Sequence, residues 1–267
     1  MSRATQSELL EQRIVENTSA QGVDLATWIF ERVRVQPGAR VLELCCGTGG
    51  QTLPLLERVG NEGSVVALDI SRSALDTLMA KAGAENGKRL TCVEANIDEF
   101  SSSLLQAGRA RAGVLQDGFD LIFCAYGLYY SSDAQRTLRE MRSRLKREGR
   151  IVMVGPFGPN NRQLFDLVRA SGVVLSEPVV YSSERFMLQT VLPWSAENFA
   201  STSVHTMVNP VRWSAAERVL NYWQNTTFYD AAKREPFEQL LRAHFAEHQE
   251  FVNEKWVMLV EMSHGRS

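Results

Sequence analysis

Short apolar runs alternate with segments of helical periodicity over the first 158 residues, and this alternation constrains the fold more than any other feature of the chain. The apolar runs are VLEL, SVVALDIS, RLTCVEANI, FDLIFCAYG and RIVMVGPF, and helical segments such as TLPLLERV and SALDTLMAKA lie between them. Strands that are apolar on both faces and alternate with helices are typical of a parallel sheet with right-handed crossovers. We therefore predict an α/β fold whose sheet is covered by helices on both faces.

The pattern is less regular outside these five strands. Residues 101–118 are polar and glycine-containing, which predicts a surface excursion, and the following helix is expected to begin at Ser132 or Asp133 and to end at Gly149. Residues 173–232 are rich in aromatic side chains but have no clean period, so we expect a cap inserted in the fold. HQEFVNE and KWVMLVEM, residues 248–262, are expected to form two antiparallel strands that close the sheet.

The predicted fold class is thus a Rossmann-like, seven-stranded, mostly parallel sheet with an antiparallel last strand, helices on both faces and a cap insertion. For the domain organisation we predict an N-terminal helical cap over residues 1–22 and a single domain over 23–267, with the insertion at about 173–232.

Composition excludes several classes of protein. The chain has 29 Lys and Arg residues against 31 Asp and Glu, so its net charge is −2, whereas a nucleic-acid-binding protein normally has a basic footprint. No run approaches the roughly 18 apolar residues of a membrane-spanning helix, and the polar N-terminus lacks the apolar core of a secretory signal. The four cysteines do not show zinc-finger spacing. We expect a cytoplasmic protein that binds no nucleic acid, no membrane and no metal.

A glycine-containing turn follows the first apolar run and opens a helix, in the segment Glu43-Leu-Cys-Cys-Gly-Thr-Gly-Gly50. In an open parallel sheet, ligands bind at the carboxyl ends of the strands, and a helix N-terminus favours an anionic group. Asp69 lies 20 residues after Gly49, at the end of the second strand, where a carboxylate can accept hydrogen bonds from the two hydroxyl groups of a ribose. This arrangement predicts a nucleotide-type ligand.

Two nucleotide ligands are compatible with such a turn. The dinucleotide fingerprint G-x-G-x-x-G is incomplete, because Thr52 occupies its last position when it is started at Gly47, and this disfavours an NAD-dependent oxidoreductase. The methyltransferase pattern has an acidic residue before the turn, an acidic end to strand two, a polar residue after strand three and aromatic residues after strand four. Glu43, Asp69, Asn96 and Tyr126 occupy these positions in order.

On these residues the sequence resembles the class I S-adenosylmethionine (SAM)-dependent methyltransferases, in particular the small-molecule and ubiquinone/menaquinone-type enzymes. The resemblance runs from about residue 23 to 158 and resumes at 233–262. It implies that SAM is the cofactor and that S-adenosylhomocysteine (SAH) is the product. It also implies that the methyl group passes by in-line displacement to an O or N atom, less often a C atom, of a small-molecule metabolite. A SAM-binding regulatory protein without catalysis is the other alternative, since a cofactor site does not guarantee chemistry.

The resemblance also implies roles for individual residues. Glu43, Cys45, Gly47 and Gly49 would hold the methionine end of SAM, flanked by Cys124 and Ala125, while Asp69 would bind the ribose. Ile70 would lie against the adenine, and Asn96 and the backbone of Ile97 would meet its polar edge. Two of these residues depart from the family pattern: Cys45 stands where the first glycine is usual, and Asn96 stands where an aspartate is usual.

The residues that contact the acceptor are less sharply indicated. Methyl transfer needs positioning more than acid–base chemistry, so a general base is required only for some acceptors. Candidates for the catalytic groups are Tyr126, Tyr129, Tyr130 and His205, and candidates for substrate binding are Arg185, Trp194, Tyr222 and Tyr229. The aromatic residues of the insertion could equally form the core of the cap.

Overall fold

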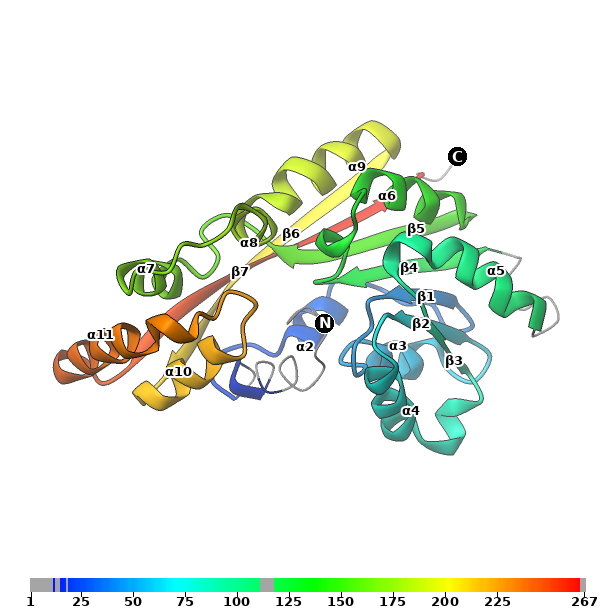
Figure 1. Ribbon diagram of the computed structural model, residues 1–267. Helices are drawn as coiled ribbons and strands as arrows, with labels where there is room; N and C mark the ends of the chain where they lie inside the picture. Colours follow the sequence, from blue (N-terminus) through cyan, green and yellow to red (C-terminus); the bar gives the residue numbers. More distant parts are fainter. Residues whose placement is uncertain (1–11, 13–14, 18, 111–117, 265–267) are drawn as a thin grey trace. The chain divides into compact units, whose positions relative to one another are not determined.

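The computed structural model describes residues 12, 15–17, 19–110 and 118–264, and the chain divides into two compact units. The larger unit comprises residues 25–155, 189–205 and 259–267, and the smaller unit comprises residues 1–24, 156–188 and 206–258. Most of the predicted N-terminal cap, residues 1–22, lies outside the described residues. Figure 1 identifies the helices and strands of both units.

Seven strands form one sheet in the order β3-β2-β1-β4-β5-β7-β6. Their bounds are β1 Arg40–Leu44, β2 Ser64–Asp69, β3 Leu90–Glu94, β4 Phe119–Ala125, β5 Leu145–Pro156, β6 Ser201–Trp213 and β7 Phe251–Ser263. Strands β1 to β5 pair in parallel. The Phe157 N–H donates to the Trp256 carbonyl, and the Asn161 N–H donates to the Glu254 carbonyl. Residue numbers therefore rise along one segment as they fall along the other, which is the arrangement beside an antiparallel strand. The predicted mostly parallel, seven-stranded fold is confirmed.

Helices connect the strands in both units. In the larger unit they are α2 Leu25–Phe30, α3 Thr52–Val59, α4 Arg72–Gly87, α5 Phe100–Ala110, α6 Ala134–Ser143 and α9 Leu192–Asn198. In the smaller unit they are α7 Arg162–Ala170, α8 Glu177–Val180, α10 Ala216–Gln224 and α11 Arg234–Glu247. Figure 1 shows α3 and α4 beside β1, β2 and β3, the strands whose ends carry the glycine turn and Asp69.

The larger unit is built around the central strands. Side chains such as Leu42, Leu44, Ile122 and Phe123 are fully buried, because the strands β1 and β4 are apolar on both of their faces. This rigid centre holds the carboxyl ends of β1, β2 and β4 in register, with Leu44 opposite both Leu68 and Cys124.

The smaller unit has an aromatic core of its own. Trp213, Trp223, Phe237 and Phe251 are buried there, and the rings of Trp223 and Phe237 lie 4.1 Å apart between centroids. Several of the aromatic residues within 173–232 therefore serve as core, which is one of the two interpretations that the sequence left open.

Three expectations about individual elements are wrong. Residues 248–262 do not form two strands, since one long strand, β7, runs through them, and the sixth strand is β6, inside the stretch expected to be an irregular cap. β6 stands at the end of the strand order. Its first eight residues are largely exposed and lack the alternation that marks a half-buried strand, which only its last five residues show. The polar residues after position 100 form α5 up to Ala110 rather than an excursion; residues 111–117 lie outside the described residues.

The third error concerns the end of α6. The helix begins after Asp133, whose side chain accepts a hydrogen bond from the Arg136 N–H, as predicted, but it ends at Ser143 instead of Gly149. Leu145 already belongs to β5 and pairs with Phe119. A Cβ atom at Gly149 would lie 2.6 Å from the Phe119 carbonyl oxygen, so this glycine permits close strand approach and does not stop a helix.

Candidate functional site: the carboxyl ends of β1, β2 and β3

The glycine turn leaves β1 at Cys45 and enters α3. Three of its residues have positive φ angles, namely Cys45 at 57°, Gly47 at 53° and Gly49 at 90°. The turn is held to the neighbouring strand by a 3.0 Å hydrogen bond from the Cys46 N–H to the Leu68 carbonyl. A Cβ atom at Gly49 would lie 2.4 Å from Leu78 Cδ1 of α4, so a side chain at position 49 would displace the buried Leu78 side chain and would also be strained at a φ of 90°.

Asp69 ends β2 and holds the turn from the other side. Its Oδ2 accepts a 2.8 Å hydrogen bond from the Gly47 N–H, and its Oδ1 accepts a 2.9 Å bond from the Ser71 N–H. The side chain is half-buried, and each carboxylate oxygen has a second lone pair that remains available for a hydroxyl donor. Asp69 is thus oriented by the backbone while it keeps capacity for a diol.

Glu43 is buried at the end of β1, with 2% of its surface exposed. Its Oε2 accepts a 2.5 Å hydrogen bond from the Thr52 hydroxyl of α3. Burial raises the pKa of Glu43 to about 8; the Thr52 hydrogen bond lowers it, and the negative charge of Asp69 raises it further. At neutral pH the side chain is therefore mostly protonated in the absence of a nearby cation, and a cationic ligand group would favour its ionised form.

Asn96, Ile97 and Ile70 lie beside Asp69. The Ala95 N–H donates a 3.0 Å hydrogen bond to the Asp69 carbonyl, which brings the segment after β3 next to the end of β2. Ile97 is buried, whereas Ile70 has half of its surface exposed and presents an apolar face at this edge. Asn96 precedes the short helix η2, Ile97–Glu99, and caps it through its side chain.

Cys45 occupies a left-handed backbone conformation that usually requires glycine. Its thiol shares a hydrogen bond with the thiol of Cys124 at the end of β4, and this bond together with burial raises the pKa of Cys45 well above its usual range. A Cβ atom at Gly127 would lie 2.3 Å from Cys45 Cβ and 2.6 Å from Cys45 Sγ. The missing side chain at Gly127 is what makes room for Cys45.

This packing gives a testable prediction. Gly127→Ala should destabilise the protein by about 1–3 kcal/mol, the usual cost of overpacking, because the Cys45 Cβ atom cannot move without shifting the turn. Cys45→Gly should be tolerated, and the double variant Cys45→Gly with Gly127→Ala should recover most of the loss. The free energy of unfolding in urea measures all three. A double variant as unstable as Gly127→Ala alone would show that Cys45 is not the obstacle.

The tyrosine candidates follow β4 in the larger unit. Tyr126 has a φ angle of 56°, and its N–H donates a 2.8 Å hydrogen bond to the Val154 carbonyl of β5. Tyr129 and Tyr130 lie in the short helix η3, Leu128–Tyr130, with their ring centroids 4.8 Å apart, and half of the Tyr130 surface is exposed. The structure therefore brings all three tyrosines to the strand end that carries Cys124 and Ala125.

The remaining candidates are dispersed. In the larger unit, His205 is an exposed residue of β6, and Trp194 of α9 is buried against Phe199. In the smaller unit, Arg185 pairs with Glu177 at 2.5 Å. Tyr222 is also buried there, and its hydroxyl accepts a 2.6 Å hydrogen bond from Lys255 Nζ.

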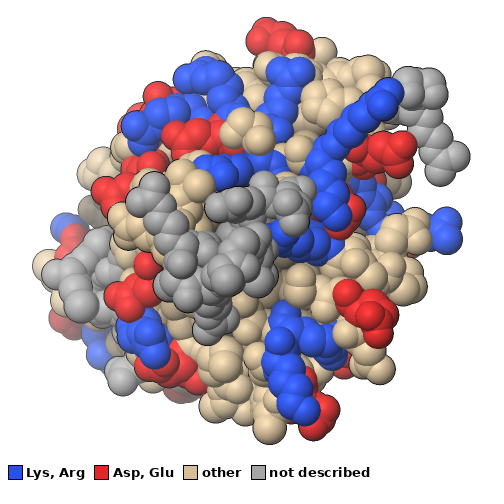
Figure 2. All heavy atoms as spheres, turned by 90° about the vertical axis from the view of Figure 1, so that its right-hand side faces the viewer, with Lys and Arg blue, Asp and Glu red and all other residues tan. Residues whose placement is uncertain are grey.

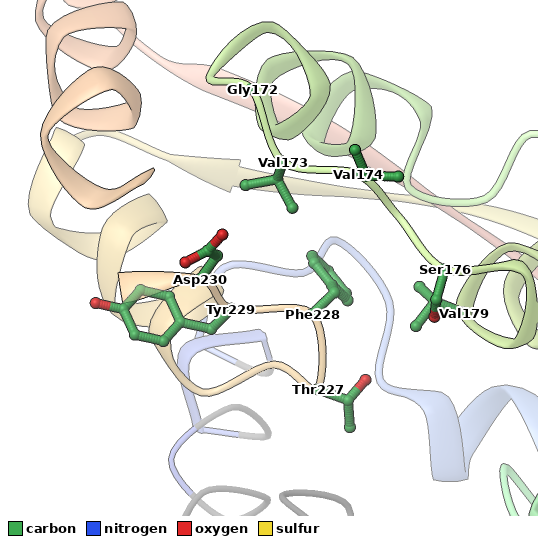
Figure 3. Close-up of a pocket in the computed structure, with 9 residues that line it drawn as sticks. All are labelled: Gly172, Val173, Val174, Ser176, Val179, Thr227, Phe228, Tyr229 and Asp230. Atoms are coloured by element: carbon green, nitrogen blue, oxygen red, sulfur yellow. The ribbon is translucent and has the colours of Figure 1, made fainter. Parts of the chain in front are cut away.

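Tyr229 is one of the residues around a cavity of about 400 Å³ in the smaller unit, which Figure 3 shows in close-up. Valine side chains and Phe228 supply apolar surface, while hydroxyl groups and Asp230 supply polar surface. The lining residues are Gly172, Val173, Val174, Ser176, Val179, Thr227, Phe228, Tyr229 and Asp230. The Asp230 side chain also accepts a 2.9 Å hydrogen bond from the Ala232 N–H.

Sequence reasoning missed three contributors to the site: Thr52, Gly127 and the link between Asp98 and Ser131. The Ser131 hydroxyl donates a 2.6 Å hydrogen bond to Asp98 Oδ1, and so ties the segment after β3 to the segment after β4. No local pattern announces these residues, because each acts on a partner at least nine positions away.

Surface charge, metal-ligating side chains and apolar helices do not point to a further kind of site among the described residues. On the face drawn in Figure 2, Lys and Arg side chains are interspersed with Asp and Glu side chains. Within the described ranges, no three His, Cys, Asp or Glu side chains gather as a metal-binding group. Likewise, no helix in the part of the chain that the structure covers has the length and apolarity needed to span a bilayer.

Comparison with known proteins supports the sequence resemblance. The family model described as a methyltransferase domain matches residues 36–190. Over 134 residues the chain is 34% identical to a demethylmenaquinone methyltransferase of Lactococcus lactis, covering 49% of this chain and 48% of the relative. Over 129 residues it is 32% identical to a 2-phytyl-1,4-naphtoquinone methyltransferase of Trichormus variabilis, covering 48% and 51%. The chain thus spans about half the length of the curated relatives it matches.

A solved structure gives the same result for the fold. The YcgJ protein from Bacillus subtilis superimposes with a TM-score of 0.61 at 14% sequence identity, covering 91% of this chain and 98% of that one. Identity this low shows a shared fold only. The family match, by contrast, spans more than half of the chain, from the residues before β1 through the glycine turn and Asp69 to the segment beyond β5. The chain therefore belongs to the methyltransferase-domain family.

Proposed function

We propose that the protein is a SAM-dependent methyltransferase that acts on a small-molecule acceptor. The observation that carries this proposal is the joint arrangement of Glu43, the glycine turn and Asp69. The Gly47 N–H of the turn donates a hydrogen bond to Asp69, which can still accept hydrogen bonds from a ribose. The buried Glu43 lies close enough to Asp69 for the negative charge of Asp69 to raise its pKa. An acidic pair of this kind suits a ligand that carries both a sugar diol and cationic groups.

SAM, when bound, supplies an electrophilic methyl group on a sulfonium. The proposed task of the chain is then to bind and orient. Asp69 accepts hydrogen bonds from the ribose hydroxyls, and Ile70 lies against the base. Asn96 and the backbone N–H of Ile97 meet the polar edge of the base. Glu43 and the turn at Cys45, Gly47 and Gly49 receive the methionine end. Cys124 and Ala125 border that end from β4. Positioning an acceptor in line with the S–CH₃ bond can supply much of the rate without an acid–base pair.

For the acceptor we propose an aromatic or quinoid small molecule, because the curated relatives are named for quinone substrates. The methyl group would pass to an oxygen or nitrogen atom of the acceptor, or to a ring carbon. Tyr126, Tyr129, Tyr130 and His205 stay predictions for the catalytic side, and Arg185, Trp194, Tyr222 and Tyr229 stay predictions for the acceptor side.

Calorimetric titration with SAM, SAH and NAD tests the cofactor. We expect binding of SAM and SAH and none of NAD; binding of NAD without SAM would favour the oxidoreductase alternative. Incubation with methyl-labelled SAM and a panel of quinols, phenols and amines then tests the reaction, with labelled product identified by mass spectrometry. Binding of SAM with no labelled product from the panel or from a metabolite extract would favour a regulatory role.

A further inference from the structure

Asp98 joins the segment after β3 to the segment after β4. Its Oδ1 accepts a 2.6 Å hydrogen bond from the Ser131 hydroxyl, and both of its carboxylate oxygens lie 3.1 Å from the Ser132 N–H. On the side of β3, the Asp98 N–H donates a 3.0 Å hydrogen bond to Asn96 Oδ1. One residue of the helix η2 therefore holds two segments that lie far apart along the chain.

The carboxylate of Asp98 is charged when it makes this bridge. Burial raises the pKa of Asp98, but the hydrogen bonds from Ser131 and Ser132 and the positive charge of Arg136 outweigh burial, so the pKa is lowered. Hydrogen bonds to an ionised acceptor are roughly twice as strong as those between neutral groups. The guanidinium of Arg136 also donates a 3.3 Å hydrogen bond to the Asp98 carbonyl.

Ser131 extends the bridge to the start of α6. A hydroxyl has one proton, and Ser131 donates it to Asp98, so the Thr137 hydroxyl is the donor in its 2.9 Å contact with Ser131. The Ser131 Oγ also accepts a 3.2 Å hydrogen bond from the Asp133 N–H. The Ser131 hydroxyl is thus fully used, and Asp98 is the acceptor that fixes its direction.

The tyrosines of η3 end directly before this bridge. The Tyr130 N–H donates a 3.0 Å hydrogen bond to the Gly127 carbonyl, and the Ser131 N–H donates a 3.0 Å hydrogen bond to the Leu128 carbonyl. Leu128 is buried, whereas half of the Tyr130 surface is exposed. Leu128 therefore fixes the start of η3, and the bond from Ser131 to Asp98 fixes its end.

We propose that Asp98 is a positioning residue that couples the cofactor side of the site to its acceptor side. This inference rests on the proposed function, which sets the segment after β3 against the base of the cofactor, and deepens it. A cofactor that immobilises this segment also immobilises η3 through Asp98 and Ser131, and such coupling is reciprocal. Tyr129 and Tyr130 are then in place for the acceptor only while the bridge is intact.

Hydrogen exchange of the backbone amides of residues 128–132, followed by mass spectrometry with and without SAH, tests the coupling. In the wild type we expect SAH to slow this exchange about fivefold or more, the lower end of the usual range for coupled sites. In Asp98→Ala, SAH should still protect residues 95–97 but should no longer affect residues 128–132. Asp98→Asn keeps the size of the side chain and one acceptor oxygen but loses the charge, so its response should be intermediate.

Turnover distinguishes positioning from a purely structural role. A misplacement of about 1 Å can cost on the order of 100-fold in rate, so Asp98→Ala should lower kcat by about 10- to 100-fold with the acceptor that the labelled-SAM panel identifies. Its dissociation constant for SAH should stay within about fivefold of the wild type, the size of the coupling. Glu99→Ala is the matched control, because Glu99 is an exposed residue of the same short helix, and it should change neither quantity.

The outcomes separate the inference from the proposed function. An Asp98→Ala variant with the wild-type response of residues 128–132 to SAH, or with the wild-type kcat, overturns the inference and leaves the cofactor assignment intact. A loss of SAH affinity as large as the loss of kcat also overturns it, since Asp98 would then act on cofactor binding alone. If the wild type binds SAH but labels no acceptor, the exchange data decide. A wild type that binds no SAH overturns the proposed function, and the inference with it. Circular dichroism of all variants confirms that the measurements come from folded protein.

Discussion

Asp69→Ala is expected to weaken SAH binding by about 1.5–3 kcal/mol, a factor of about 10 to 150, because the ribose loses hydrogen bonds to a charged group. The same substitution removes the acceptor for the N–H groups of Gly47 and Ser71, so the turn loses its anchor as well. The dissociation constant from calorimetric titration at constant pH and salt measures the effect.

Asp76→Ala provides the matched control. Asp76 is an exposed carboxylate of the helix that follows Asp69, and it pairs with Arg72 in an exposed i,i+4 ion pair, which contributes little. Its removal should leave the dissociation constant unchanged. Equal binding by wild type and Asp69→Ala would show that the ribose is held elsewhere and would remove the central support of the proposed site.

The affinity for SAH should rise with pH between about 6 and 7.5, by up to tenfold per pH unit, because of Glu43. Burial raises the pKa of this carboxyl to about 8 in the ligand-free protein, so at pH 7 it is largely protonated. The ammonium group of the cofactor favours the carboxylate, so binding must release the proton. Thr52, Asp69 and Cys46 are the polar and titratable groups that act on or respond to Glu43.

Titrations at pH 7 in two buffers of different ionisation enthalpy count the released protons. Glu43→Gln keeps the size and the Thr52 hydrogen bond but has no proton to lose, so it should release fewer protons and show a flatter pH profile. Titration of the cofactor's own amine is common to both proteins and cancels in the comparison. Identical proton release by wild type and Glu43→Gln would contradict the assignment of the methionine end to Glu43.

Glu43 also makes the stability of the ligand-free protein depend on pH. Its pKa is raised in the folded state, so the folded protein binds the proton more tightly than the unfolded chain between about pH 4.5 and 8. Stability from this group is thus fully present below the unfolded pKa and is lost as the pH rises toward 8. Glu43→Gln should reduce this slope in urea unfolding followed across that range.

The parts of the fold and site that were predictable from the sequence are those written in local patterns. The five parallel strands were visible because each contains a short apolar run, and β1, β2 and β4 are buried on both faces. The glycine turn and Asp69 could be placed because a parallel sheet puts the ends of β1 and β2 at one edge. β6 could not be found in this way, since the first eight of its residues are largely exposed and show no alternation. The end of α6 was misplaced because Leu145 fits the helical period by chance.

The amino-acid sequence by itself therefore determined the sheet, the cofactor turn and the family, since these depend on which residue types follow one another along the chain. Tertiary structure alone decided how Cys45 is accommodated by Gly127, how Glu43 comes to be buried beside Thr52 and Asp69, and which way the amide of Asn96 faces. Hydrogen-bond direction, burial and steric room are properties of neighbours in space. Those neighbours come together only when the strands and helices pack.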